Sequence, residues 1–398
     1  MAATDRILIA GAGPVGLVGA LDLARRGIPV TVVEAEPALT VDLRASTFHP
    51  PTLDMLDALG VTAGLIDQGL IAPTWQYRDR MEGPVAIFDL GLLKGETGHP
   101  YRVQCEQWKL TRLLYEALGR FSHAEVRFGH RAAGVRQENG VVTLLADGPK
   151  GPTELSGRYV IAADGARSAI RKALGIAFEG FTFPERFLVV STPFEFAEPL
   201  PRLSLINYIS DPEEWLVLLR VKEFWRVLLP TGADEDDATL LSDAGIEARL
   251  QRLVATGRPY PIVHRTLYHV HQRVAARYRA GGVFLAGDAA HINNPLGGMG
   301  MNGGIHDALN LTEKLAAVIG GADEALLDRY ERQRRPIALD YVQQATIRNR
   351  QVLSERDPAV RRGVLDDLRN TAADPSLARD FLLRTSMIAS VRKAASLS

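Results

Sequence analysis

Residues 6–34 read RILIAGAGPVGLVGALDLARRGIPVTVVE, and this stretch decides how the fold begins. The apolar run at 6–10 predicts a buried strand, and the β-branched run at 30–34 predicts a second one. Between them a helical pattern follows the glycines and ends at Arg25-Arg26-Gly27, which is a helix stop signal. Strand, glycine turn, helix and strand in this order indicate a βαβ unit of a parallel sheet with a right-handed crossover.

The glycine turn has the G-x-G-x-x-G spacing in Gly11, Gly13 and Gly16, with Pro14 and Val15 between the last two. Gly11 permits the tight turn, Gly13 lets the backbone approach a pyrophosphate, and Gly16 allows close packing of helix on strand. Free N–H groups at the start of the helix then face the phosphates. The alternative is that the glycines serve only a tight turn. The context between strand and helix favours dinucleotide binding.

An acidic residue, Glu34, ends the second predicted strand 18 residues after Gly16. This spacing is close to that of an acid that binds ribose hydroxyls. Because a carboxylate there disfavours a ribose 2′-phosphate, NAD or FAD fits this site better than NADP.

A second glycine-rich segment spans residues 287–302 and follows another strand-like run. Asp288, at the carboxyl end of that run, can accept hydrogen bonds from a polyol chain, or it can cap the next helix. The turn opens a helix near Gly300, where backbone N–H groups point at an electron-rich group. A cofactor with a polyol linker and a polarised ring would bind both to Asp288 and to the N–H groups at the start of the helix, which favours a flavin. We expect His291 to be a buried structural histidine.

The remaining pattern predicts an α/β protein. Strand-like runs at 158–163 and 283–286 belong with the first unit, residues 187–230 indicate an inserted antiparallel sheet, and the chain beyond residue 323 is helical. The fold class is therefore a Rossmann-like dinucleotide-binding domain with an inserted, mainly antiparallel β-sheet substrate domain and a C-terminal helical segment. The expected division is 1–75, 98–178 and 270–345 for the first domain, 76–97 and 179–269 for the second, and 346–398 for the C-terminal helices.

Composition excludes several classes of function. The 398 residues carry 46 Lys plus Arg against 47 Asp plus Glu, so a net charge of −1 gives no reason to expect nucleic acid or a membrane as partner. Cys105 is the only cysteine, which fits a reducing compartment and excludes a cysteine metal cluster. The sequence begins without an apolar signal stretch, and no window in it approaches 18 uninterrupted apolar residues, so we expect a cytoplasmic protein.

Together, several motifs resemble those of the FAD-dependent aromatic hydroxylases, the single-component flavoprotein monooxygenases of the para-hydroxybenzoate hydroxylase type. The motifs are GAGPVG at 11–16, Arg44, Gln104, ADGARSAIRKALGI at 163–176 and GDAAHINNPLGGMGMNGGIHDALNL at 287–311. The resemblance covers roughly residues 5–345 and implies FAD as cofactor, with NADH or NADPH as co-substrate.

The resemblance also implies roles for single residues. Arg44 would contact the cofactor from the loop after the second strand, unless it is a solvated loop arginine. Gln104 would lie near the FAD linker, unless it only starts a helix. Asp164 belongs to a turn implicated in FAD and NAD(P)H binding, Asp288 would hold the ribityl chain, and Pro295 would line the reactive face of the isoalloxazine.

The closing loop would serve the flavin ring. Gly298 lies in the loop, and Gly300, Met301 and Asn302 would present backbone N–H groups and a helix dipole to the N1–C2=O edge. Met299 departs from the family, in which a polar residue often stands between the glycines.

The activity that follows from the resemblance is hydroxylation of a phenolic or heteroaromatic, acidic small molecule. NAD(P)H reduces FAD, O2 gives a C4a-hydroperoxyflavin, and the electron-rich ring attacks its distal oxygen. Tyr208, Arg220 and Trp225 are candidates for substrate contact, although an outward-facing arginine and core aromatics are the plainer interpretations. No catalytic base is identified, and no histidine spacing indicates a metal site.

Two alternatives remain open on the sequence alone. One is another FAD oxidoreductase on the same scaffold, of the isoprenoid reductase or halogenase type, although the expected W-x-W-x-I-P halogenase motif does not occur. The other is a non-catalytic flavin-binding protein.

Overall fold

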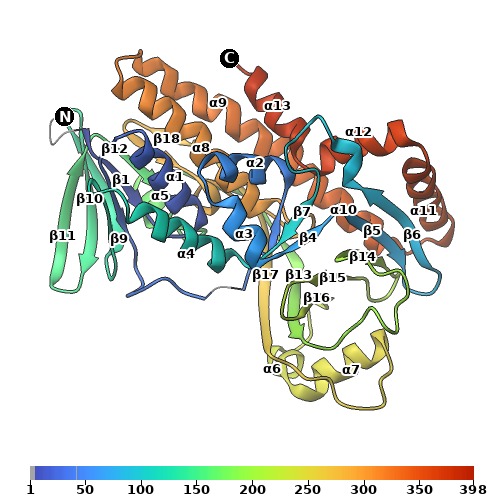
Figure 1. Ribbon diagram of the computed structural model, residues 1–398. Helices are drawn as coiled ribbons and strands as arrows, with labels where there is room; N and C mark the ends of the chain where they lie inside the picture. The colour runs from blue at the N-terminus through green and yellow to red at the C-terminus, as the bar shows by residue number, and fades with distance from the viewer. Residues whose placement is uncertain (1–4, 42) are drawn as a thin grey trace.

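The first βαβ unit forms the centre of a six-stranded sheet. The computed structural model describes residues 5–41 and 43–398. The sheet has the order β18-β19-β12-β1-β2-β8, with parallel pairing except between β18 and β19 (Figure 1). Its strands are β1 (Ile7–Ala10), β2 (Val30–Val33), β8 (Ala124–Arg127), β12 (Tyr159–Ala162), β18 (Arg279–Ala280) and β19 (Val283–Leu285). The predicted Rossmann-like domain is confirmed.

Helices and a small sheet cover the six strands. Helix α1 (Pro14–Arg25) packs against α8 (Gly300–Ile319) and α4 (Gln107–Leu118), and all three bury apolar side chains in one core. Further cover comes from the three-stranded antiparallel sheet of β9 (Arg131–Glu138), β10 (Val141–Gly148) and β11 (Gly151–Gly157), and from helix α5 (Ala169–Ala173).

The inserted domain is built on an eight-stranded sheet with the order β20-β17-β13-β16-β15-β14-β5-β6. All its neighbouring pairs are antiparallel except β14 and β5. Its strands are β5 (Thr74–Asp79), β6 (Gly83–Asp89), β13 (Phe178–Thr192), β14 (Ile206–Ser210), β15 (Leu216–Arg220), β16 (Trp225–Thr231), β17 (His264–Ala275) and β20 (His291–Ile292). Separate apolar clusters cover its two faces, and α6 (Asp237–Leu241) and α7 (Asp243–Leu253) extend from one end (Figure 1).

A three-stranded antiparallel sheet of β3 (Thr47–Phe48), β7 (Arg102–Gln104) and β4 (Leu70–Ala72) lies where the two large sheets meet. Helices α2 (Pro50–Ala58) and α3 (Thr62–Gln68) lie between its strands in the sequence. This small sheet brings Thr47 and Gln104 opposite each other.

The chain ends in helices α9 (Asp328–Ile337), α10 (Gln344–Ser354), α11 (Pro358–Ala373), α12 (Pro375–Thr385) and α13 (Ile388–Ser396). Asp357 and Asp374 accept backbone N–H bonds at the starts of α11 and α12, where a proline occupies the first turn. Helix α11 packs on β6, and a π-helical segment over residues 338–343 joins α9 to α10. The predicted C-terminal helical segment is confirmed.

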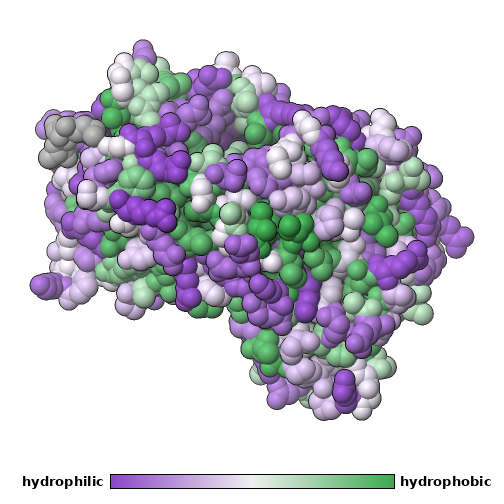
Figure 2. All heavy atoms as spheres, in the orientation of Figure 1, coloured by the Kyte–Doolittle hydropathy of each residue, from purple (hydrophilic) through white to green (hydrophobic). Residues whose placement is uncertain are grey.

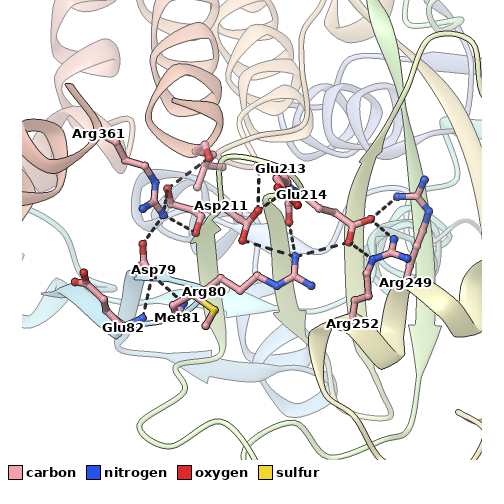
Figure 3. A network of polar contacts seen from close by, with 12 residues as sticks. Asp79, Arg80, Met81, Glu82, Asp211, Glu213, Glu214, Arg249, Arg252 and Arg361 are labelled. Carbon is pink, nitrogen blue, oxygen red and sulfur yellow. Dashed lines mark hydrogen bonds and ion pairs between the residues drawn. The ribbon is translucent and has the colours of Figure 1, made fainter. Parts of the chain in front are cut away.

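A series of ion pairs links helices α7 and α11 to the domain of the large sheet (Figure 3). Arg361 of α11 pairs with the buried carboxylate of Asp79, which also accepts the N–H groups of Met81 and Glu82. Farther along the same face, Glu214 lies between Arg80 and the arginines of α7. Paired charges therefore hold the α7 and α11 ends of this domain.

Hydrophilic residues alternate with smaller hydrophobic clusters on the face shown in Figure 2. Across residues 5–41 and 43–398, no helix has both the length and the apolar content that crossing a membrane requires.

Candidate active site

A cavity of about 490 Å3 lies between the glycine turn after β1 and the large sheet. Its nucleotide-side wall includes Gly13, Pro14, Val15, Arg44, Asp288, Pro295, Gly298, Gly300 and Met301. Its sheet-side wall includes Tyr208, Val217, Leu219, Arg226, Leu228, Thr266, Tyr268 and Val270. Most of the residues predicted for cofactor binding are thus brought to one cavity from three separated parts of the chain.

The glycine turn leaves room for a ligand at one position only. Gly11 has φ +100°, and a Cβ there would lie 2.3 Å from the Ala163 carbonyl oxygen. A Cβ on Gly16 would lie 1.9 Å from the Gly11 carbonyl oxygen, so both glycines serve tight backbone packing. A Cβ on Gly13 would meet no protein atom within 4 Å. Since α1 begins at Pro14 without a side-chain cap, its first N–H groups are available to a phosphate at this point.

Glu34 lies beside this turn but outside the cavity lining. Its carboxylate accepts the Ala12 N–H at 2.7 Å and the Glu36 N–H at 3.0 Å. The side chain therefore holds the glycine turn against the end of β2, the place predicted for a ribose.

Gln104 and Asp164 carry buried polar atoms that protein groups do not satisfy. Gln104 Oε1 accepts the Thr47 hydroxyl at 3.0 Å, and its Nε2 has no hydrogen-bond partner in the described part of the chain. Asp164 Oδ2 accepts the N–H groups of Ala169 and Ile170, whereas Oδ1 has no such partner among the same residues. Burial raises the pKa of Asp164. Buried polar atoms of this kind are normally bonded, so a ligand that satisfies them fits the site.

Asp288 is exposed to the cavity, and a buried charge cluster supports its turn. Asp307 accepts the Gly287 N–H at 3.2 Å, His291 Nε2 at 2.7 Å and Arg334 Nε at 2.6 Å. Burial raises the pKa of Asp307, but its interactions with Arg334 and His291 lower it by more, so the pKa of Asp307 lies below its ordinary value. The predicted burial of His291 is confirmed.

The closing loop is held by Asn302 and Met299. The Asn302 side chain accepts the His49 N–H at 3.0 Å and donates to the carbonyls of Thr47 and Gly298. Met299 is 3% exposed and packs with Val342 and Met387 of the C-terminal helical region. The departure from the family pattern at Met299 therefore has a packing reason.

The large sheet does not bring all three predicted substrate residues to the cavity. Tyr208 lines it, whereas Arg220 and Trp225 are outside the lining. The Trp225 Nε1–H donates to Glu195 Oε1 at 2.9 Å, and Arg220 pairs with the same carboxylate at 3.4 Å.

Strand alternation explains this correction. Val217 and Leu219 of β15 face the cavity, so Arg220 points to the opposite face. On β16 the cavity-facing position is taken by Arg226, next to Trp225. Arg226 is 2% exposed and donates to the Arg44 carbonyl and the Ser46 hydroxyl, which ties the Arg44 loop to the sheet.

These observations fit FAD. Open space at Gly13, the unsatisfied atoms of Gln104 and Asp164, and an acidic side chain at Asp288 match a long dinucleotide with a polyol linker. The start of α8 at Gly300 supplies backbone N–H groups to an electron-rich ring edge.

Comparison with known proteins agrees with this assignment. Residues 4–345 match the family described as FAD binding domain. Para-nitrophenol 4-monooxygenase of Pseudomonas sp. (strain WBC-3) is 35% identical over 395 residues, covering 96% of each chain. 6-Hydroxy-3-succinoylpyridine 3-monooxygenase of Pseudomonas putida (strain DSM 28022 / S16) is 32% identical and covers 96% of this chain and 98% of its own.

A solved structure extends the similarity to three dimensions. The crystal structure of p-nitrophenol 4-monooxygenase from Pseudomonas putida DLL-E4 superposes with a TM-score of 0.92, at 32% identity and 98% coverage of both chains. Fold and site thus define a flavoprotein of the FAD binding domain family. Within it, the chain belongs to the FAD-dependent aromatic hydroxylases, and it is a monooxygenase that uses O2 and an aromatic substrate.

Proposed function

We propose that this enzyme hydroxylates a single-ring phenol or hydroxypyridine, with the ring held between the closing loop and the large sheet. The observation that carries the proposal is the composition of the sheet-side wall. Val217, Leu219 and Leu228 give it apolar surface, while Tyr208 and Tyr268 add hydroxyl groups. A wall of this kind accommodates an aromatic ring and gives its oxygen a hydrogen-bond partner.

The relatives that this chain matches over nearly their whole length support a substrate with a single ring. The relatives matched over 96% of their length or more are named for nitrophenol and a hydroxypyridine. Structures named for polycyclic substrates, anhydrotetracycline and aklavinone hydroxylases, are covered over only 76% and 67% of their chains. Both whole-chain relatives are named as monooxygenases, and neither is named as a halogenase or an isoprenoid reductase.

The cofactor sites are also part of the proposal. The glycine turn at 11–16 would hold the pyrophosphate of FAD, Glu34 its ribose, Gln104 its linker and Asp288 its ribityl chain. When bound and reduced by NADH or NADPH, FAD supplies activation of O2 for transfer of one oxygen atom to the ring.

The protein's own contribution is to orient the ring, exclude water and favour negative charge. Leu219 and Leu228 exclude water beside the ring, and the Tyr208 hydroxyl orients its oxygen. The N–H groups at the start of α8 favour an anionic ring edge at Gly300.

We further propose the domain division 1–75, 98–178 and 270–345 for cofactor binding, 76–97 and 179–269 for substrate binding, and 346–398 as a covering helical segment. The two large sheets support this division. A cytoplasmic location is proposed because NADH and NADPH are supplied there, and because the single cysteine, Cys105, is a buried free thiol.

The test is oxidation of NADH and NADPH by the FAD-loaded protein with a panel of single-ring phenols, hydroxypyridines and polycyclic phenols, with product masses determined in parallel. Ring-dependent oxidation that gives a product containing one new oxygen atom supports the proposal. Oxidation without an oxygenated product, or turnover of polycyclic phenols alone, contradicts it.

A further inference from the structure

Arg102, the first residue of β7, is a charged group buried behind the substrate side of the cavity. It is 1% exposed, and its guanidinium carbon lies 5.0 Å from the centroid of the Trp75 ring. Its Nη2 donates to the Thr385 carbonyl at 3.1 Å. Within residues 5–41 and 43–398, neither Nε nor Nη1 has a hydrogen-bond partner, and the ionisable groups that act on this guanidinium are Tyr208 and Tyr77 rather than a carboxylate. A buried arginine stays protonated, so the site holds a positive charge without a matching anion.

The groups around Arg102 connect it to the cavity. Its charge acts on Tyr208, which lines the cavity, and on Tyr77, whose ring centroid lies 5.5 Å from that of Tyr208. Burial raises the pKa of Tyr208, and Arg102 opposes that shift more than any other side chain. The Tyr77 hydroxyl donates to Asn349 Oδ1 at 3.0 Å, so it too lies in this buried polar group.

The other titratable neighbours do not neutralise the charge. Burial, followed by Arg102 itself, lowers the pKa of His49 well below its ordinary value, so His49 is neutral. Arg348 of α10 acts on Tyr77 and adds positive charge. Burial raises the pKa of Tyr77 well above its ordinary value, so its hydroxyl stays protonated and supplies no anion either.

We propose that Arg102 is a positioning residue that acts through Tyr208 to keep the oxygen of a bound phenol ionised. The proposal rests on the proposed function, because it requires a phenol in this cavity. A phenolate oxygen at the Tyr208 hydroxyl supplies the negative charge that the surroundings of Arg102 lack, and hydrogen bonds to charged groups are the stronger ones. An ionised ring is also richer in electrons, which favours transfer of oxygen to it.

The C-terminal helices take part in this arrangement. Thr385 is the last residue of α12, so its carbonyl belongs to the negative end of that helix. This carbonyl accepts the hydrogen bond from Nη2 of Arg102. Helix α12 therefore fixes the guanidinium in place without cancelling its full charge.

The test uses oxidised, FAD-loaded enzyme without NADH or NADPH, and 4-nitrophenol as the probe, because its phenolate absorbs visible light and its neutral form does not. Difference spectra over a pH series give the pKa of the bound probe. In the unchanged protein we expect this pKa to lie at least one unit below that of the free probe, which is about tenfold in the ionisation constant. Arg102→Met should remove this difference, Tyr208→Phe should remove much of it, and Arg102→Lys should retain most of it.

Arg171→Met is the matched control. Arg171 is also buried, its guanidinium carbon lies 3.8 Å from the Phe178 ring centroid, and it donates to the carbonyls of Ala289 and Ala166. Loss of this arginine should leave the pKa of the bound probe unchanged.

The possible failures are distinct. If the unchanged protein binds no phenol in the cavity, the proposed function fails and this inference with it. If the probe binds with its free pKa, or if Arg102→Met and Tyr208→Phe leave a lowered pKa in place, the inference fails and the proposed function stands. If Arg102→Met does not fold, the pair Tyr208→Phe and Arg102→Lys decides by the same measurement.

Discussion

The two walls of the cavity present different chemical groups, backbone on the nucleotide side and side chains on the sheet side. On the nucleotide side, Gly13 and the start of α8 at Gly300 present backbone, and the critical property is the absence of a Cβ. On the sheet side, Tyr208, Leu219 and Leu228 present side chains from alternate positions of neighbouring strands. The first wall is therefore sensitive to any added atom, and the second is sensitive to which face a strand residue occupies.

The largest effect is expected at the backbone wall. In Gly13→Val the added Cβ meets no protein atom within 4 Å, so the protein should fold, but the side chain takes the space proposed for the pyrophosphate. We expect complete loss of bound FAD, seen as loss of flavin absorbance after gel filtration with an unchanged Tm of the apoprotein. Gly363→Val, in exposed α11 with equally open space, is the control and should remain yellow. A yellow Gly13→Val protein would show that the cofactor lies elsewhere.

The next effect concerns the scaffold behind the same wall. Asp307→Asn leaves Arg334 buried without its carboxylate, and removing one partner of a buried ion pair costs about 3–5 kcal/mol in the free energy of unfolding. Urea unfolding of the two proteins measures this difference. A change below about 1 kcal/mol would mean that the Asp307 cluster is not what fixes the Asp288 turn.

The Asp307 cluster also predicts a dependence of stability on pH. The pKa of Asp307 is lowered in the folded state, so its contribution is complete above the unfolded value of about 4 and is lost as pH falls through the lower folded pKa. The unchanged protein should lose stability on acidification by more than Asp307→Asn does. Unfolding curves at several acidic pH values measure the difference, and parallel losses would contradict this interpretation.

A smaller effect is expected where a side chain serves the backbone wall. Asp288→Ala removes the carboxylate proposed to bind the ribityl chain while the glycine turns remain. We expect FAD to bind about ten- to a hundredfold more weakly, which corresponds to about 1.4–2.7 kcal/mol, in fluorescence titrations. Full retention of FAD at low concentration would remove Asp288 from the site.

The smallest effects distinguish the two faces of β15. Leu219→Ala opens the wall beside the substrate, so KM for the aromatic substrate should rise about tenfold, as expected for loss of a buried apolar contact. Arg220→Ala, one residue along, removes a side chain on the opposite face and should change KM less than about twofold. Equal effects of the two substitutions would mean that the substrate does not lie against this face.

Local motifs make the backbone wall predictable from the sequence. Gly11, Gly13 and Gly16 lie between β1 and the start of α1 in one short stretch of the chain, and Asp288 comes shortly after buried strand β19. The parallel sheet then brings such turns to the same edge, so the cavity's position follows from the fold class.

Long-range pairing makes the sheet-side wall hard to predict. Which residues of β15 face the cavity depends on its pairing with β14 and β16 and on the packing of the whole sheet, and a shift of one residue exchanges the faces. For this reason the sequence pattern does not reveal Arg226 and Tyr268. Its candidates Arg220 and Trp225 lie outside the cavity lining, in agreement with the plainer interpretations given for them. Arg102 and Asp307 carry no local signal at all. The burial of Arg102 depends on a helix residue 283 positions later, and that of Asp307 on a helix residue 27 positions later.

The pairing of β12 with β19 also constrains how the enzyme is made. The two strands are neighbours in the six-stranded sheet, yet the whole eight-stranded sheet except β5, β6 and β20 is synthesised between them. A growing chain therefore leaves the edge of β12 unpaired until residues 283–285 have emerged, and Asp288 and α8 follow later still. Contacts so distant in sequence form slowly, and open strand edges favour aggregation. The nascent chain thus cannot complete its FAD site until about three quarters of it has been translated, so cofactor binding is a late step in its biogenesis.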